Sequence, residues 1–147
     1  MEKEKNHNFT KEMVESIYLR NYGSSEYYKR SYCDSLIYTE GIRDFQITLN
    51  AFWIIECIIA TLPKITKISK SVDDGFFIVQ ISVDEELNKG VFEIFREGYI
   101  NNKYNDLITV ERQEIDCIDL PEYDYKFYLI LTQLEPVQFT LLLTSEY

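Results

Sequence analysis

The chain has 147 residues, a formal net charge of −10 and a hydrophobic content of 46%. A chain of this length suits one domain, and its hydrophobic content is too high for an intrinsically disordered protein. The negative charge disfavours direct binding to nucleic acid, because carboxylates repel phosphates. We therefore expect a single folded domain over residues 1–147.

The negative charge lies almost entirely in the second half of the chain. Residues 1–70 carry nine Asp and Glu against ten Lys and Arg, whereas residues 71–147 carry sixteen against five. Such a split gives the folded protein one acidic end, which attracts a basic partner. It indicates a class of partner and no reaction.

The cysteines and the histidine do not form a metal-binding pattern. Cys33, Cys57 and Cys117 lie far apart, and the single histidine, His7, lies in a polar leader. This spacing does not fit a zinc site and is typical of free thiols in a reducing compartment. The leader, residues 1–8, lacks the apolar core of a signal peptide and is expected to be frayed. We expect a cytoplasmic protein without a metal or another cofactor.

The N-terminal part of the chain begins with a helical pattern. Residues Phe9–Tyr22 are expected to form a helix with Met13 and Ile17 on its inner face. Gly23 should end this helix, since glycine readily adopts the left-handed conformation of a helix C-terminus. Leu36–Tyr38 is expected to be a brief strand or an extended link.

Two further helices are expected in close succession. Thr39 should cap a helix at about Glu40–Asn50, because its hydroxyl can accept a hydrogen bond from the first turn. The inner face of that helix should consist of Ile42, Phe45 and Leu49. Ala51–Leu62 then predicts a helix that ends before Pro63 and is apolar on nearly every side, as in the most buried helix of a domain. It is too short to span a bilayer, so no membrane association is expected.

The periodicity changes to that of strands after these helices. Phe77–Val83 alternates between apolar and polar residues, as a half-buried strand does. Val91–Arg96 and Leu107–Ile115 are further strand candidates, and Tyr125–Thr132 with Val137–Thr144 predicts a hairpin. Helices followed by strands favour an α+β fold, with the N-terminal helices packed on one face of a C-terminal antiparallel sheet.

Four short phrases of the chain resemble those of a protein family. They are residues Arg20–Arg30, Tyr38–Ile42, Phe52–Glu56 and Leu141–Tyr147, which read RNYGSSEYYKR, YTEGI, FWIIE and LLLTSEY. In this order they resemble a family of small, uncharacterised bacterial and phage proteins. The resemblance implies a shared fold and a phage or mobile-element origin, and it implies no chemistry.

The densest run of acidic residues is interleaved with aromatic ones. Acidic groups beside exposed tyrosines suit a surface that faces a Lys- and Arg-rich groove. A solvated acidic loop that only aids solubility is an equally open interpretation. The predicted partner-binding residues are Asp116, Asp119, Glu122, Tyr123, Asp124 and Tyr125, with Glu85 and Glu86 from a second acidic turn.

A second candidate site is a pocket between the helices and the sheet, formed by Tyr38, Trp53 and Glu56. Glu56 has apolar neighbours on its helix. Burial there would raise its pKa and allow it to act as a general acid or base. The structural alternative is a carboxylate that is hydrogen-bonded to a tyrosine or paired with Arg43 or Arg20.

Other motifs carry less weight. The acidic turns 73–75 and 84–86 lack the spacing of a calcium loop and are read as solvated turns. Tyr27–Arg30 mixes aromatic and basic residues, as some nucleic-acid-binding segments do, against the overall negative charge. Phosphate-loop, nucleophile-elbow and dinucleotide motifs are absent from the sequence.

These observations favour a non-catalytic binding protein that inhibits a basic, nucleic-acid-binding host protein, such as a defence nuclease, through its acidic half. The alternative is a small enzyme or ligand-binding module at the Glu56 pocket. A third possibility is a homodimer in which an unpaired C-terminal strand, such as Leu141–Thr144, pairs with its copy.

Overall fold

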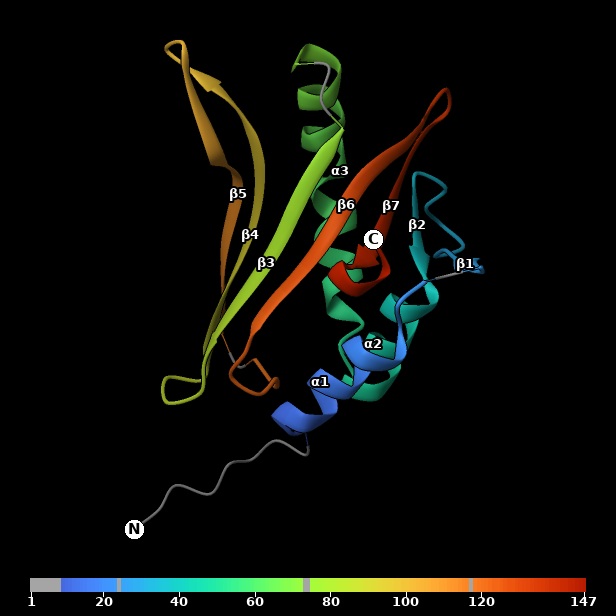
Figure 1. The fold of residues 1–147 in the computed structure, drawn as a ribbon, viewed down its shortest axis with the longest axis vertical. Helices are drawn as coiled ribbons and strands as arrows, with labels where there is room; N and C mark the ends of the chain where they lie inside the picture. Colours follow the sequence, from blue (N-terminus) through green and yellow to red (C-terminus); the bar gives the residue numbers. More distant parts are fainter. Residues whose placement is uncertain (1–8, 24, 73–74, 117) are drawn as a thin grey trace.

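A seven-stranded sheet forms the centre of the computed structural model, which describes residues 9–147 except 24, 73–74 and 117. The expected frayed leader and the acidic pair at 73–74 lie outside the described residues. The described elements, shown in Figure 1, are α1 (Lys11–Arg20), β1 (Tyr27–Tyr28), β2 (Leu36–Thr39), α2 (Glu40–Leu49), α3 (Trp53–Val72), β3 (Phe76–Asp84), β4 (Lys89–Ile100), β5 (Lys103–Asp116), β6 (Asp124–Leu134), β7 (Val137–Leu143) and the 3₁₀ helix η1 (Thr144–Glu146).

The strand order of the sheet is β1-β2-β7-β6-β3-β4-β5. Only the β2–β7 pair is parallel among these neighbours, and the other pairs are antiparallel. The helix α3 lies behind the sheet in Figure 1, and α1 and α2 lie at its lower end. The predicted α+β class is confirmed.

Helix α1 is shorter at both ends than its sequence pattern predicts. Thr10 caps its start, since the Thr10 hydroxyl accepts a hydrogen bond from the Met13 N–H at 3.3 Å. Asn21 ends it with an extended backbone, and its amide donates back to the Ile17 carbonyl at 2.9 Å. The polar side chain of Asn21 therefore ends this helix ahead of Gly23.

Helix α2 follows its prediction closely. Thr39 is the N-cap, with its hydroxyl 3.3 Å from the Ile42 N–H. Asn50 ends the helix in the left-handed conformation, with φ at 51°. This conformation suits asparagine better than most residues, and it turns the chain sharply into α3. The predicted inner face of Ile42, Phe45 and Leu49 is buried.

Helix α3 continues through Pro63 to Val72, so its predicted end before Pro63 was wrong. Proline in a helix interior removes one backbone hydrogen bond and costs about 3 kcal/mol. Each fully buried Ile or Leu side chain contributes about 1.5–3 kcal/mol. The packing of Leu62 and Ile65 on either side of Pro63 therefore offsets this cost. Pro63 itself is exposed.

Strand β3 has the predicted alternation, and its inward residues Phe77, Val79, Ile81 and Val83 are buried. Strands β4 and β5 extend further than predicted. They form a long hairpin whose turn is Asn101–Asn102, with φ values of 52° and 64°. Asparagine tolerates such positive φ values, so the turn needs only two residues.

The predicted hairpin of β6 and β7 is present, with its turn at Glu135–Pro136. Strand β7, however, pairs with β6 on one side and with β2 on the other. Phe139–Leu141 therefore have a strand on each side, so the free edge expected at Leu141 is absent and strand β7 is not an unpaired strand. This pairing cannot be predicted from the order of the strands in the sequence, because the short strand β2 comes early in the chain and pairs with the last strand, β7.

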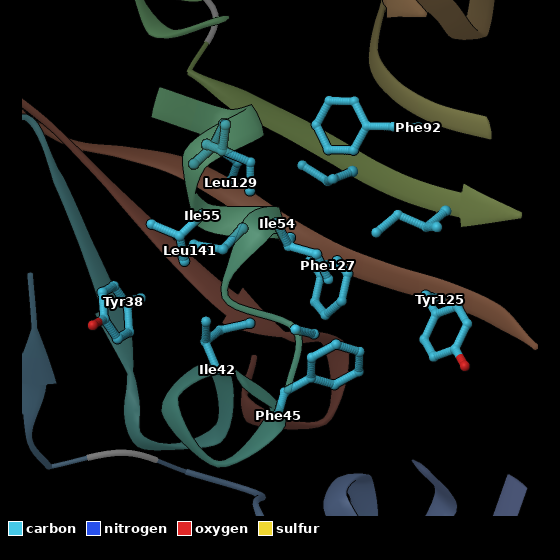
Figure 2. Close-up of a cluster of buried hydrophobic side chains, with 14 of the residues drawn as sticks. Tyr38, Ile42, Phe45, Ile54, Ile55, Phe92, Tyr125, Phe127, Leu129 and Leu141 are labelled. Atoms are coloured by element: carbon cyan, nitrogen blue, oxygen red, sulfur yellow. The ribbon is translucent and has the colours of Figure 1, made fainter. Parts of the chain in front are cut away.

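The core lies between the sheet and the helices, as Figure 2 shows. Phe45 of α2 meets Phe127 of β6 edge to face, with ring centroids 5.1 Å apart. Ile54 and Ile55 of α3 and Leu129 of β6 are buried in the same cluster. This packing fixes α2 against the start of β6.

Candidate protein-binding surface at the acidic end of the sheet

The register of the sheet brings the acidic residues of separate segments to one end of the molecule. Asp124, which begins β6, pairs with Ser82 near the end of β3, and Asp116, which ends β5, pairs with Lys89 at the start of β4. The β3–β4 turn lies at the same end, at the lower left in Figure 1. This region, called the acidic end below, contains Glu85, Glu86, Asp116, Asp119, Glu122 and Asp124.

Buried residues alternate with exposed carboxylates over residues 118–122 of the loop between β5 and β6. Ile118, Leu120 and Pro121 are buried, whereas Asp119 and Glu122 are exposed. The apolar residues anchor the loop to the core by the free energy of their burial. The carboxylates between them consequently point to solvent from an anchored backbone.

Tyr125 is buried beneath this loop. The expectation that it is an exposed partner-binding residue was therefore wrong. Its side chain is 0% exposed, and its ring meets Phe45 edge to face at 5.7 Å. The Tyr125 hydroxyl donates to the Pro121 carbonyl at 2.5 Å. Burial raises the pKa of this hydroxyl, so it remains protonated and continues to donate. Strand alternation turns Tyr125 inward between the exposed Asp124 and Lys126.

A hydrogen bond joins the β3–β4 turn to the β5–β6 loop. The Glu85 carboxylate accepts a bond from the Glu122 N–H at 2.8 Å. Within the turn, the Asp84 carboxylate accepts bonds from the N–H groups of Glu86 at 3.0 Å and Leu87 at 3.3 Å. The two acidic segments therefore form one preorganised surface.

The ion pairs of the described residues lie outside this surface. They are Arg20–Asp44, Lys29–Asp34, Arg30–Glu56, Lys64–Glu111 and Arg112–Glu114. Among residues that the structure describes, no cation pairs with Glu86, Asp116, Asp119, Glu122 or Asp124. These carboxylates are exposed to solvent.

Apolar groups accompany the charges at this end. Leu87 is 65% exposed at the tip of the β3–β4 turn. Tyr123 is half-buried, with its ring 6.3 Å from that of Tyr18 and 5.3 Å from that of Tyr125. Charged groups around a partly exposed aromatic ring are typical of protein-binding surfaces.

The structure distinguishes between the two environments that the sequence leaves open for Glu56. Its side chain is 53% exposed, and it accepts hydrogen bonds from the Tyr32 hydroxyl and from Arg30 Nε at 3.3 Å. The bond from Tyr32, together with the Arg30 guanidinium, lowers the pKa of Glu56. The alternative of a buried carboxyl with a raised pKa was therefore wrong, because the Glu56 side chain is exposed. The structural alternative, a carboxylate hydrogen-bonded to a tyrosine, is present, and its cationic partner is Arg30 in place of Arg43 or Arg20.

Arg30 also binds Tyr38, another residue of the predicted pocket. It donates to the Tyr38 hydroxyl at 3.1 Å and to the Gln46 side-chain oxygen at 2.9 Å. Tyr38 is buried, and Trp53 packs partly buried against the core. Tyr38 and Glu56 are thus joined through an arginine that the sequence interpretation did not assign to them, and Trp53 supports the core.

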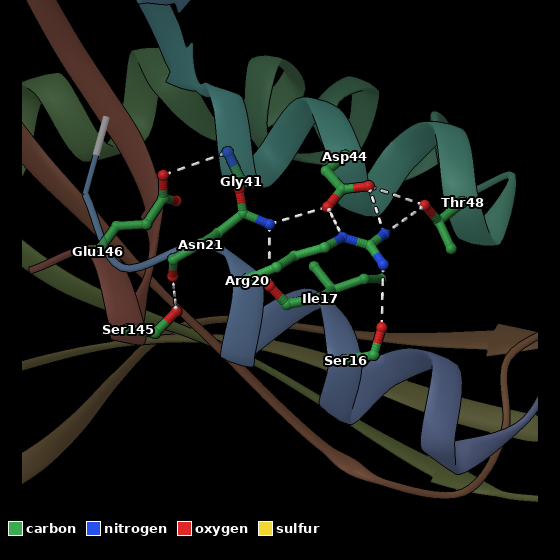
Figure 3. Close-up of polar contacts among 9 residues, drawn as sticks. All are labelled: Ser16, Ile17, Arg20, Asn21, Gly41, Asp44, Thr48, Ser145 and Glu146. Atoms are coloured by element: carbon green, nitrogen blue, oxygen red, sulfur yellow. Dashed lines mark hydrogen bonds and ion pairs between the residues drawn. The ribbon is translucent and has the colours of Figure 1, made fainter. Parts of the chain in front are cut away.

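A second polar network joins α1, α2 and the end of the chain (Figure 3). Arg20 binds both carboxylate oxygens of Asp44, at 2.6 and 2.7 Å, and Asn21 and Thr48 donate to the same carboxylate at 2.8 Å. Burial alone raises the pKa of Asp44, but these donors outweigh burial and the pKa lies below its ordinary value. No motif or spacing in the sequence indicates this network.

The phrases that carry the family resemblance meet in these two networks. Glu146 of the last phrase accepts from Thr39 at 2.6 Å and from the Gly41 N–H at 3.2 Å, both in the second phrase. Ser145 donates to the Asn21 carbonyl of the first phrase at 2.6 Å. The sequence signal that could have indicated these contacts was the order of the four phrases, whose residues contact one another in the folded protein.

No group of three His, Cys, Asp or Glu residues within the described ranges is arranged to hold a metal ion. Among the described helices, none is both long and apolar enough to cross a membrane.

The fold and the acidic end define an α+β protein of one mixed sheet with a preorganised acidic surface. Residues 14–147 match a family of unknown function, DUF6876, and the protein belongs to this family. The resemblance to an uncharacterised family is thereby confirmed. Comparisons with curated proteins and with solved structures gave no match.

Proposed function

We propose that this protein is a non-catalytic inhibitor, encoded by a phage or a mobile element, that acts in the cytoplasm of the host cell. Its acidic end binds a basic, nucleic-acid-binding host protein, such as a defence nuclease, and blocks its nucleic-acid channel. The observation that carries this proposal is the set of carboxylates without ion pairs among the described residues, held on a loop that buried residues anchor.

The electrostatic argument concerns both affinity and competition. Clustered carboxylates on an anchored loop give a field of the same sign as that of nucleic acid, so the two compete for one basic groove. Preorganisation matters because the loop loses little conformational entropy on binding. Leu87 and Tyr123 add apolar contact area that nucleic acid does not offer in the same form.

The hydrogen bonds that Glu56 accepts argue against the alternative function, a small enzyme at the Glu56 pocket. A general acid needs a pKa near the working pH, whereas Arg30 and Tyr32 stabilise the charged form of Glu56. Its carboxylate connects α3 to the segment before β2.

The test is affinity capture from bacterial lysate at low and high salt. We expect the wild-type protein to retain a basic protein at low salt, to lose it at high salt, and to lose it when DNA is added. Charge reversal at Asp116, Asp119, Glu122 and Asp124 should abolish the capture. Retention of the same protein by this variant would contradict the proposal.

A further inference from the structure

An open hollow of about 610 Å³ lies at the acidic end. Its described lining consists of Lys11, Ser82, Val83, Glu122, Tyr123 and Asp124. These residues come from the start of α1, the end of β3 and the segment that leads into β6. The hollow thus lies within the surface that the proposed function uses.

One wall of the hollow is aromatic and held in place. Tyr123 lies 6.3 Å from Tyr18 and 5.3 Å from Tyr125, and the Tyr18 hydroxyl donates to the Lys126 carbonyl at 3.1 Å. Tyr123 is half-buried, so part of its ring remains accessible. Val83 is only 7% exposed and extends the apolar wall.

The rim of the hollow carries negative charge. Glu122 and Asp124 are exposed, and in the described part of the chain neither forms an ion pair. Lys11 is the only cation among the described lining residues. The site therefore combines an apolar wall with two carboxylates, and it attracts a cation with an apolar stem.

We propose that this hollow receives an arginine side chain of the basic partner; the inference rests on the proposed function and deepens it. Arginine fits better than lysine for two reasons. Its planar guanidinium stacks on a tyrosine ring and binds carboxylates through paired donors, whereas the lysine ammonium is a strongly hydrated point charge. Lys11 competes with the incoming arginine, because it places a positive charge in the same hollow.

The experiment compares two defined probes, fluorescein-labelled hexa-arginine and hexa-lysine, by fluorescence anisotropy at fixed salt. The wild-type protein should bind hexa-arginine about 3–10-fold more tightly than hexa-lysine, as expected for stacking at a partly exposed ring. Tyr123→Leu should bring this ratio close to one, and Tyr123→Phe should retain it. Lys11→Gln should tighten the binding of hexa-arginine.

A matched control separates the hollow from the surface as a whole. The double variant Glu86→Gln/Asp116→Asn removes two charges at the same end outside the described lining. It should weaken both peptides equally and leave their ratio unchanged. Tyr123→Phe keeps the ring and removes the hydroxyl, so it shows which of the two distinguishes hexa-arginine from hexa-lysine.

The outcomes for the two proposals differ. Equal binding of both peptides to the wild-type protein, no binding of either peptide, or an unchanged ratio in Tyr123→Leu overturns the arginine site. The proposed function is decided separately, by whether charge reversal abolishes capture of the partner. It survives loss of the arginine site and is contradicted if the reversed variant still binds.

Discussion

The carboxylate of Glu146 accepts a hydrogen bond from the Thr39 hydroxyl at 2.6 Å, although 107 residues separate the two in the chain. It also accepts bonds from the N–H groups of Gly41 at 3.2 Å and Leu143 at 3.0 Å. A carboxylate at a helix N-terminus satisfies amides that the helix leaves unpaired and interacts favourably with the helix dipole. Glu146 thereby fastens the end of the chain to the start of α2.

This contact requires glycine at position 41. A Cβ atom there would lie 2.3 Å from Glu146 Oε1 and 2.7 Å from Leu143 Cδ1. We expect Gly41→Ala to destabilise the protein by about 1–3 kcal/mol, as overpacking of a filled site does. Urea denaturation measures this change. Gly23→Ala is the matched control, since nothing lies within 4 Å of its Cβ position, and equal losses in both variants would contradict the account.

The Asp44 network predicts a pH-dependent stability difference. The pKa of Asp44 is lowered in the folded protein, so its contribution is present above the unfolded pKa of about 3.9 and is lost as the pH falls through the folded value. Asp44→Asn should cost about 1–3 kcal/mol at pH 7 and less at lower pH. Asp34→Asn, which removes an exposed pair with Lys29, should change stability little at either pH, because water screens this pair. Denaturation at pH 7 and pH 3 distinguishes the two.

Replacement of Pro63 by alanine is expected to stabilise the protein. Pro63 lies exposed inside α3, where it removes a backbone hydrogen bond. We expect Pro63→Ala to raise the free energy of unfolding by about 1–2 kcal/mol, after allowance for the greater entropy of the unfolded alanine chain. Lys67→Ala on the same helix should change stability by less than about 0.5 kcal/mol. A less stable Pro63→Ala protein would show that the proline has a role that this account omits.

Removal of the Tyr125 hydroxyl is expected to loosen the loop between β5 and β6. Tyr125→Phe removes the bond to the Pro121 carbonyl and should cost about 1 kcal/mol. Hydrogen exchange of the amides in residues 118–123 should become faster, because the loop loses one of its attachments. Tyr128→Phe is the control, since the Tyr128 hydroxyl makes no hydrogen bond with a described residue. Unchanged exchange in Tyr125→Phe would mean that burial of the loop residues alone holds it.

Local signals predicted several elements correctly. The Thr39 cap and the alternation of Phe77–Val83 depend on neighbouring residues, so the sequence contains the relevant chemistry. The extension of α3 through Pro63 could not be predicted in this way. It depends on packing against strands that come later in the chain, which overrides local propensity.

The candidate site also has features that the local sequence predicts and features that depend on distant parts of the chain. The carboxylates of the acidic end were visible as two runs, and the sheet register that joins them was not. Tyr125 is the clearest case: the acidic run predicts exposure, whereas its strand position turns it into the core. For Glu56 the sequence indicated a tyrosine as one possible hydrogen-bond partner, whereas the identity of its arginine, Arg30, could not be predicted because Arg30 has no recognisable spacing to Glu56.

The most direct measurement is the affinity of the captured partner for two charge-reversal variants that have the same net charge. Asp119→Lys/Glu122→Lys alters the acidic end, and Asp106→Lys/Glu135→Lys alters exposed residues near the opposite end of the sheet. Calorimetry at 0.1 M salt should show a loss of about tenfold or more for the first variant and little change for the second. Equal losses in both variants would mean that net charge, and not the acidic end, determines binding.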